Sequence, residues 1–134
     1  MQISSDLGKL VLRLTLGILI LLHGVGKITA GPDPILGLMT KTGLPPVVGY
    51  LVYVGEVLAP LLLIVGLWTR LAALVVAINM VVAVLLVHTA QLGEFTKNGG
   101  WALELQVFYF FTAVAIALLG AGGYSAGGEE GKLN

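Results

Sequence analysis

Four long apolar segments constrain the fold of this chain more than any other feature of the sequence. They cover residues 7–25, 47–67, 71–90 and 101–119. Each is close to the roughly 20 residues that a helix needs to cross the hydrocarbon core of a bilayer. The segments are continuous apolar runs without the alternation of a transmembrane strand. The sequence therefore predicts an all-α integral membrane protein, an up-and-down bundle of four transmembrane helices in a single domain.

The scarcity of charge supports the same fold class. Only 10% of the residues are charged, against about 25% in an ordinary soluble domain. Seven basic and seven acidic residues give a formal net charge of zero, which excludes nucleic-acid binding through a basic face. The expected partner is the lipid bilayer. The chain has no cysteine, so it offers no disulfide framework and no thiolate metal site.

The connections between the apolar segments differ in kind. Residues 29–46 are rich in glycine and proline and predict a loop with a short interfacial helix near 35–40. Residues 68–70 leave so little chain that the second and third segments must form an antiparallel hairpin. Residues 91–100 predict a second loop. The Gly-rich tail, 120–134, is expected to be flexible because it has no core to pack on.

Four spans place both ends of the chain on one side of the membrane. Lysine and arginine are slightly more numerous on that side, which favours cytoplasmic termini by the positive-inside rule. The terminal side carries Lys9, Arg13, Arg70 and Lys132, and the opposite side carries Lys27, Lys41 and Lys97. The first apolar run continues into His23-Gly24-Val25-Gly26-Lys27 rather than a cleavage site for a signal peptide. We therefore expect it to be a retained first span.

Polar side chains inside the apolar segments are the main indication of function. An ionisable group at the centre of a membrane helix costs roughly 2.5–3.5 kcal/mol on insertion scales. Glu56 and Asn79 are expected near the middle of the bilayer, and Arg13 is the cation expected nearest to them. The planar guanidinium can bond a carboxylate twice, so we predict an Arg13–Glu56 ion pair, direct or through Asn79. Alternatively, Arg13 extends to the interface and Glu56 is neutral.

The backbone beside Glu56 is also unusual. Pro60 lies four residues later, and a helical proline leaves the carbonyl of the residue at i−4 without its hydrogen bond. The sequence therefore predicts a kink with a free acceptor next to the deepest acid. Small residues predict close contacts between helices. They are Gly17, Gly24, Gly49, Gly55, Ala72, Ala73 and Ala77.

A second polar group is expected near the ends of the spans that face the long loops. His23, His88 and Glu104 would reach the same membrane face in an antiparallel bundle. Two imidazoles and a carboxylate could relay protons, hold a quinone head group or bind a metal, and we do not predict a metal site. Structural anchoring is the alternative, and it applies equally to Trp101, an expected interface residue.

The order of these polar residues along the chain resembles that of the DoxX family of small bacterial membrane proteins. The matching motifs run through nearly the whole chain. They are Leu12-Arg13-Leu14, His23-Gly24-Val25-Gly26-Lys27, Gly55-Glu56, Thr69-Arg70, Gly100-Trp101-Ala102-Leu103-Glu104 and Gly123-Tyr124-Ser125. The resemblance implies a four-helix protein of the bacterial inner membrane. It also implies an association with membrane redox chemistry, because the family is named after relatives linked to a quinone-reducing oxidase.

The leading functional hypothesis is therefore an accessory component of quinone-linked membrane redox chemistry. No haem or iron–sulfur motif is present in the sequence, so electrons would come from a membrane or soluble oxidoreductase partner. In this hypothesis a histidine donates to a quinone carbonyl and Glu104 carries protons. The predicted cofactor-binding residues are Arg13, His23, Glu56, Asn79, His88, Trp101 and Glu104. Two alternatives are a carrier of small or lipophilic molecules and a non-catalytic assembly factor, and the sequence leaves self-association open.

Overall fold

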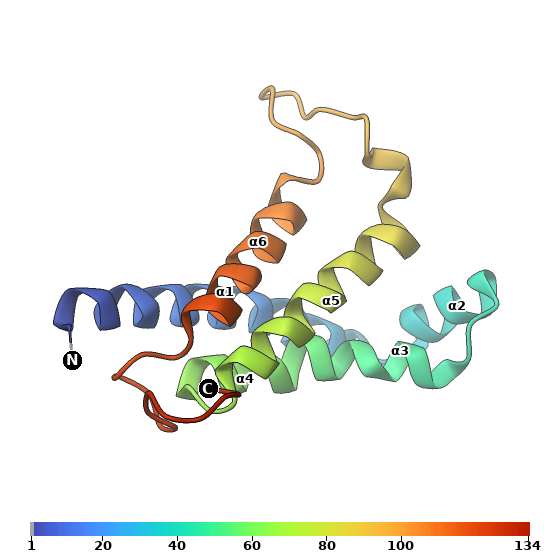
Figure 1. The fold of residues 1–134 in the computed structure, drawn as a ribbon. Helices are drawn as coiled ribbons and strands as arrows, with labels where there is room; N and C mark the ends of the chain where they lie inside the picture. The colour runs from blue at the N-terminus through green and yellow to red at the C-terminus, as the bar shows by residue number, and fades with distance from the viewer. Residues whose placement is uncertain (1) are drawn as a thin grey trace.

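The computed structural model describes residues 2–134, which form helices joined by short connections (Figure 1). The predicted all-α class is confirmed. In chain order the helices are α1 (Ile3–Ala30), α2 (Asp33–Thr42), α3 (Pro46–Tyr53), the π-helical turn η1 (Val54–Leu58), α4 (Ala59–Val65), α5 (Thr69–Val87), the 3₁₀ turn η2 (Thr89–Gln91) and α6 (Glu104–Leu119).

Three helical stretches are long and apolar enough to cross a membrane. They are Ile3–Ala30, Pro46–Val65 and Thr69–Val87. The fourth, α6, is apolar but has 16 residues, about 24 Å at 1.5 Å per residue, which is short for a hydrocarbon core of roughly 30 Å. The fourth span and the up-and-down topology therefore remain predictions.

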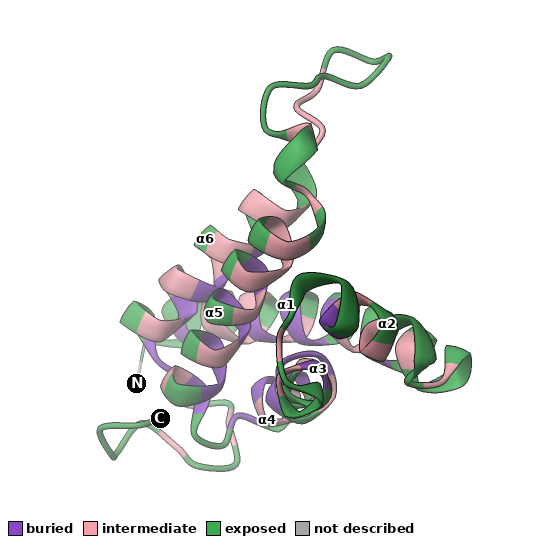
Figure 2. Ribbon diagram, turned by 90° about the vertical axis from the view of Figure 1, so that its right-hand side faces the viewer, coloured by how far each residue is buried: buried purple, intermediate pink, exposed green. Residues whose placement is uncertain are grey.

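The helices are arranged as two antiparallel pairs. The first pair is α1 with the stretch α3–η1–α4, and the second pair, α5 with α6, leans obliquely away from it (Figures 1 and 2). The pairs meet where α4, α5, α6 and the middle of α1 come together. The buried apolar core lies at this crossing and includes Leu16, Ile20, Leu63, Val76 and Ile116. Toward the α2 end, α5 and α3 diverge (Figure 1).

Glycines set the register between α1 and the second span. A Cβ on Gly17 would lie 2.8 Å from a side-chain carbon of Ile64, and one on Gly24 would lie 2.0 Å from the carbonyl oxygen of Glu56. The prediction that small residues mediate close helix contacts is confirmed at these positions. Gly24 is thus level with Glu56, near the middle of the second span.

The second span is interrupted beside Glu56, as the position of Pro60 predicted. The interruption takes the form of the π-helical turn η1, in which the N–H of Ala59 donates to the carbonyl of Val54. A π-turn widens the helix locally and often marks a functional position. It leaves the Glu56 carbonyl directed at the backbone of Gly24.

The Gly-rich tail packs on the turn between α4 and α5, so the expectation that it has nothing to pack on is wrong. The N–H of Ala126 donates to Val65 (2.9 Å), and the N–H of Arg70 donates to the carbonyl of Leu133 (2.8 Å). The side chain of Asn134 accepts from the N–H of Thr69 at 3.0 Å. Helix ends leave backbone groups unsatisfied, and here the tail supplies their partners.

Candidate functional site

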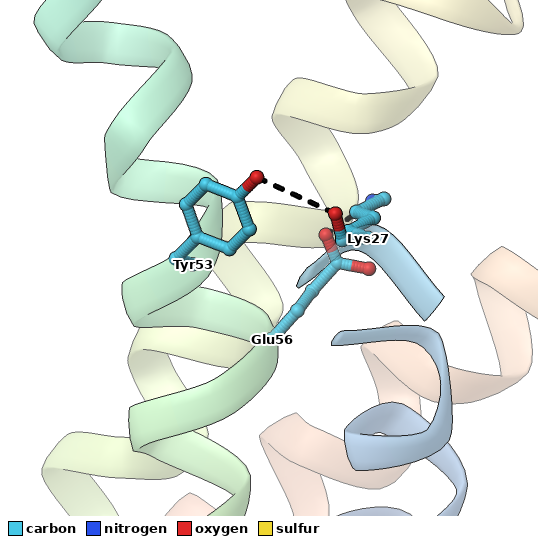
Figure 3. A network of polar contacts seen from close by, with 3 residues as sticks. All are labelled: Lys27, Tyr53 and Glu56. Atoms are coloured by element: carbon cyan, nitrogen blue, oxygen red, sulfur yellow. Dashed lines mark hydrogen bonds and ion pairs between the residues drawn. The ribbon is translucent and has the colours of Figure 1, made fainter. Parts of the chain in front are cut away.

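The acid at the middle of the second span pairs with a lysine. Lys27 donates to a carboxylate oxygen of Glu56, and the Glu56 side chain is only 6% exposed while that of Lys27 is 41% exposed. Tyr53 lies one turn before Glu56, and its hydroxyl donates to the Lys27 carbonyl at 3.5 Å (Figure 3). The three side chains join the end of α1 to the α3–η1 segment.

The predicted Arg13–Glu56 ion pair is therefore wrong. Arg13 precedes Gly24, which is level with Glu56, by eleven residues, about 16 Å along a helix. Helix α1 begins at Ile3 and ends at Ala30, so it extends beyond the predicted span at both ends. The contact of Gly24 with the Glu56 backbone sets the register, which places Lys27, rather than Arg13, beside the acid.

Arg13 has a different role at the other end of the first helix pair. It is fully buried and donates to the carbonyl of Leu63, in the last turn of α4, at 3.2 Å. It also donates to the carbonyl of Tyr124 in the tail. A cation that bonds the last carbonyls of a helix also complements the negative end of its dipole. Arg13 thus holds the tail against the end of α4.

A cavity of about 210 Å³ lies beside the Lys27–Glu56 pair. We call it the inner cavity. It is lined by the end of α1, by α2, by the α3–η1 segment and by the second half of α5. Its polar lining is Lys27, Glu56 and Asn79. Most of the remaining lining is aliphatic and includes Ile35, Leu38, Met39, Val52, Val82 and Leu86.

Asn79 is the third polar group of the inner cavity. It lies near the middle of α5 and packs closely on Gly55, where a Cβ would meet the Asn79 Cγ at 2.7 Å. Within residues 2–134 its amide is not among the atoms that form side-chain hydrogen bonds. Two amide donors and one carbonyl acceptor are therefore free to bond a ligand. The prediction that Glu56 and Asn79 lie near each other agrees with their shared place in the cavity lining.

The remaining predicted site residues do not line the inner cavity. His23 is exposed and its ring lies edge-to-face with that of Tyr109, with centroids 6.0 Å apart. His88 Nδ1 is 2.9 Å from the amide oxygen of Gln91. Trp101 donates its indole N–H to the carbonyl of Leu92 at 2.8 Å.

Glu104 is exposed at the first residue of α6. In the part of the chain that the structure describes, no ion pair or hydrogen bond joins it to either histidine. In the same described residues, no three His, Asp or Glu side chains lie close enough together to hold a metal ion. The hydrogen bonds of His88 and Trp101 stay within α5, η2 and the following loop, which is the pattern of structural contacts.

Lys27 lines the inner cavity and was not among the predicted site residues. Its position in the sequence predicts a loop-side cation at the edge of the first span. Gly17 and Gly24 are the sequence feature that could have identified Lys27. They lie two turns apart on one face of α1 and determine how that helix packs on the second span. With that face identified, Lys27 falls within one turn of Gly24.

Comparison with known proteins places this arrangement in a family. The DoxX family profile matches residues 8–89, the part of the chain that holds Arg13, Lys27, Glu56 and Asn79. The chain belongs to the DoxX family. The matched region therefore covers most of α1 and all of the helices from α2 to α5, and with them every residue that lines the inner cavity.

Two relatives extend the match over most of the chain. One is a Bacillus subtilis (strain 168) protein named "Putative oxidoreductase CatD", which is 26% identical over 121 residues, 90% of this chain and 85% of its own length. The other is an "Uncharacterized protein" of Haemophilus influenzae (strain ATCC 51907 / DSM 11121 / KW20 / Rd), 31% identical over 114 residues, 83% of this chain and 81% of its own. No solved structure gives a significant match.

Proposed function

We propose that this DoxX protein binds a quinone-type ring in the inner cavity and acts as an accessory component of a membrane redox system. The observation that carries the proposal is the lining of the cavity. One end presents the Lys27–Glu56 pair and the free amide of Asn79, and the rest is aliphatic. An apolar pocket with a few convergent polar groups is typical of a small-molecule site.

The size of the inner cavity limits what it holds. Its volume of about 210 Å³ exceeds the roughly 150 Å³ of an engineered apolar cavity that binds benzene. It falls short of the roughly 300 Å³ at which sites for drug-sized ligands begin. One small ring system, such as a substituted benzoquinone or naphthoquinone, is therefore the ligand class that fits best.

The polar end of the cavity suits a ring that bears carbonyl groups. The ammonium of Lys27 has three N–H donors, and its bond to Glu56 uses one of them. A second donor and the Asn79 amide can bond carbonyl oxygens. Reduction of a quinone to its quinol takes up two electrons and two protons. The Lys27 ammonium can supply a proton to each carbonyl oxygen in turn, if it regains one from water on its half-exposed side after each transfer.

The electrons for such a reaction would come from a partner oxidoreductase, because the sequence carries no haem or iron–sulfur motif. The name of the Bacillus subtilis relative, "Putative oxidoreductase CatD", supports a redox setting. The proposal includes α6 as a fourth span, both termini on the cytoplasmic side and residence in a bacterial inner membrane. Of the residues predicted to bind the cofactor, it retains Glu56 and Asn79 and adds Lys27.

Binding of a tailless ring to purified protein tests the proposal. We would reconstitute the full chain in nanodiscs and measure the affinity for 2-methyl-1,4-naphthoquinone by calorimetry. Asn79→Leu should weaken binding by about tenfold, the equivalent of one lost hydrogen bond to a ligand. The matched control is Gln106→Leu, a polar residue of α6 outside the inner cavity. Absence of binding, or equal affinity in a folded Asn79→Leu variant, would refute the proposal.

A carrier for small lipophiles is the second candidate function. The observation in its favour is the π-turn at mid-span, since interrupted helices at membrane depth are common in transporters. Flux into proteoliposomes that is lost in Glu56→Gln would favour this candidate. Co-purification with an oxidoreductase that survives loss of all three polar residues would instead favour a non-catalytic assembly factor.

A further inference from the structure

A second apolar pocket lies against the inner cavity, on the other side of the seam between α3–η1 and α5. We call it the outer pocket, and its volume is about 320 Å³. Three residues line both spaces: Val52 on α3, and Asn79 and Val82 on α5. The two spaces are therefore separated by one layer of side chains.

The seam between the two spaces is thin for a structural reason. Helix α5 leans away from α3 toward its C-terminal end (Figure 1). At the base of the seam, Gly55 lets the Asn79 side chain lie directly on the η1 backbone. Val52 and Val82 are the next residues along the seam, and both are only partly buried. The seam therefore consists of two partly buried valines and one amide.

The outer pocket faces the surroundings of the helices. Leu51 is 57% exposed and Ile78 is 62% exposed, and both line it. Its lining is aliphatic except for Asn79 at the seam and the backbone at Gly55. In a membrane this surface meets lipid, since both residues lie on helices long enough to span it. The pocket thus leads from the seam to the bilayer.

We propose that the ligand of the inner cavity carries an apolar chain, which crosses the seam at Val52, Asn79 and Val82 and lies in the outer pocket. This inference rests on the proposed ring binding. The inner cavity has room for one small ring system, so a long chain on that ring system must leave it. The exit that the shared lining indicates is apolar beyond Asn79 and continues into the bilayer, which matches an isoprenoid or alkyl chain.

A bulky side chain in the outer pocket tests this route. Ile78→Trp fills the pocket from its exposed side, and Val81→Trp on the same helix is the matched control because Val81 is exposed and does not line the pocket. The ligands are 2-methyl-1,4-naphthoquinone and the same ring bearing a geranyl chain. Ile78→Trp should weaken binding of the geranyl compound by about tenfold and leave the tailless ring unaffected. Val81→Trp should change neither affinity.

The results separate this inference from the proposed function. If wild-type protein fails to bind the tailless ring, the ring site itself is wrong. If the ring binds but Ile78→Trp affects both compounds equally or neither, the ring site stands and the chain route is wrong. Release of a tightly bound phospholipid by Ile78→Trp, with no change in discrimination, would also overturn the route. If Ile78→Trp does not fold, Val75→Phe fills the same pocket from the next turn.

Discussion

Replacing Gly24 with alanine tests the contact that fixes the position of the whole site. The new Cβ would lie 2.0 Å from the carbonyl oxygen of Glu56, whereas ordinary contact begins at 3.4 Å. The difference, 3.4 minus 2.0, means that the two backbones must separate by about 1.4 Å. The neighbour is a backbone atom, so no side-chain rotation relieves the clash. Lys27, one turn further along α1, would move away from Glu56 with it.

The expected cost follows from these distances. Overpacking of a tight contact costs about 1–3 kcal/mol, and glycine-to-alanine replacement in a helix returns up to about 1 kcal/mol of propensity. Gly26→Ala is the matched control, because a Cβ there meets nothing within 4 Å. It lies on the same helix two residues away and receives the propensity gain alone. We expect Gly24→Ala to be less stable than wild type and Gly26→Ala to be at least as stable as wild type.

Reversible unfolding in mixed detergent micelles, followed by circular dichroism, measures both variants against wild type. Binding of the tailless ring should also weaken in Gly24→Ala and not in Gly26→Ala, because only the first displaces Lys27. Equal unfolding free energies for the two variants would show that α1 and η1 do not meet at Gly24. The Lys27–Glu56 pairing would then lose its structural basis, since it depends on the same register.

Three further predictions follow from other parts of the structure. In a chain without cysteine, single cysteines at Asn98 and Glu130 should react with an impermeant maleimide from opposite sides of the membrane, and labelling from one side would show that α6 does not span. Lys27→Met and Glu56→Gln should each lower the unfolding free energy, because each single change leaves a partly buried group unpaired. The double variant should lose less than the sum of the two single losses, and a loss equal to that sum would refute the coupling. Arg13→Gln should speed cleavage of the tail by a Glu-specific protease, since Arg13 bonds the tail at Tyr124, and an unchanged rate would refute its holding role.

The apolar segments predicted the helical class because membrane helices must satisfy their backbone within each segment. The interruption at Pro60 was predicted for an equally local reason. The pairing of charges was not, since it depends on how α1 slides along the second span. Nothing local distinguishes Arg13 from Lys27 as a partner for Glu56; the register does, and it comes from glycine contacts between helices.

The sequence predicted the part of the candidate site that depends on positions within single segments, and not the part that depends on how the helices pack. Glu56 and Asn79 were expected at mid-membrane from their positions within single segments, and both line the inner cavity. The contribution of α2 to the cavity lining could not be foreseen, because a Gly- and Pro-rich connection does not indicate where its helix will pack. The two histidines were grouped by their distance along the spans alone. In the structure their contacts are with Tyr109 and Gln91.

The capping of α5 by the tail has a consequence for the order of assembly. The N–H groups of Thr69 and Arg70 bond the side chain of Asn134 and the carbonyl of Leu133. More than sixty residues are therefore synthesised between the start of α5 and the groups that satisfy it. During translation this helix end must bond water or lipid head groups until the tail arrives. That side of the protein can close only after α6 has been synthesised, whereas all residues that line the inner cavity are present once α5 is complete.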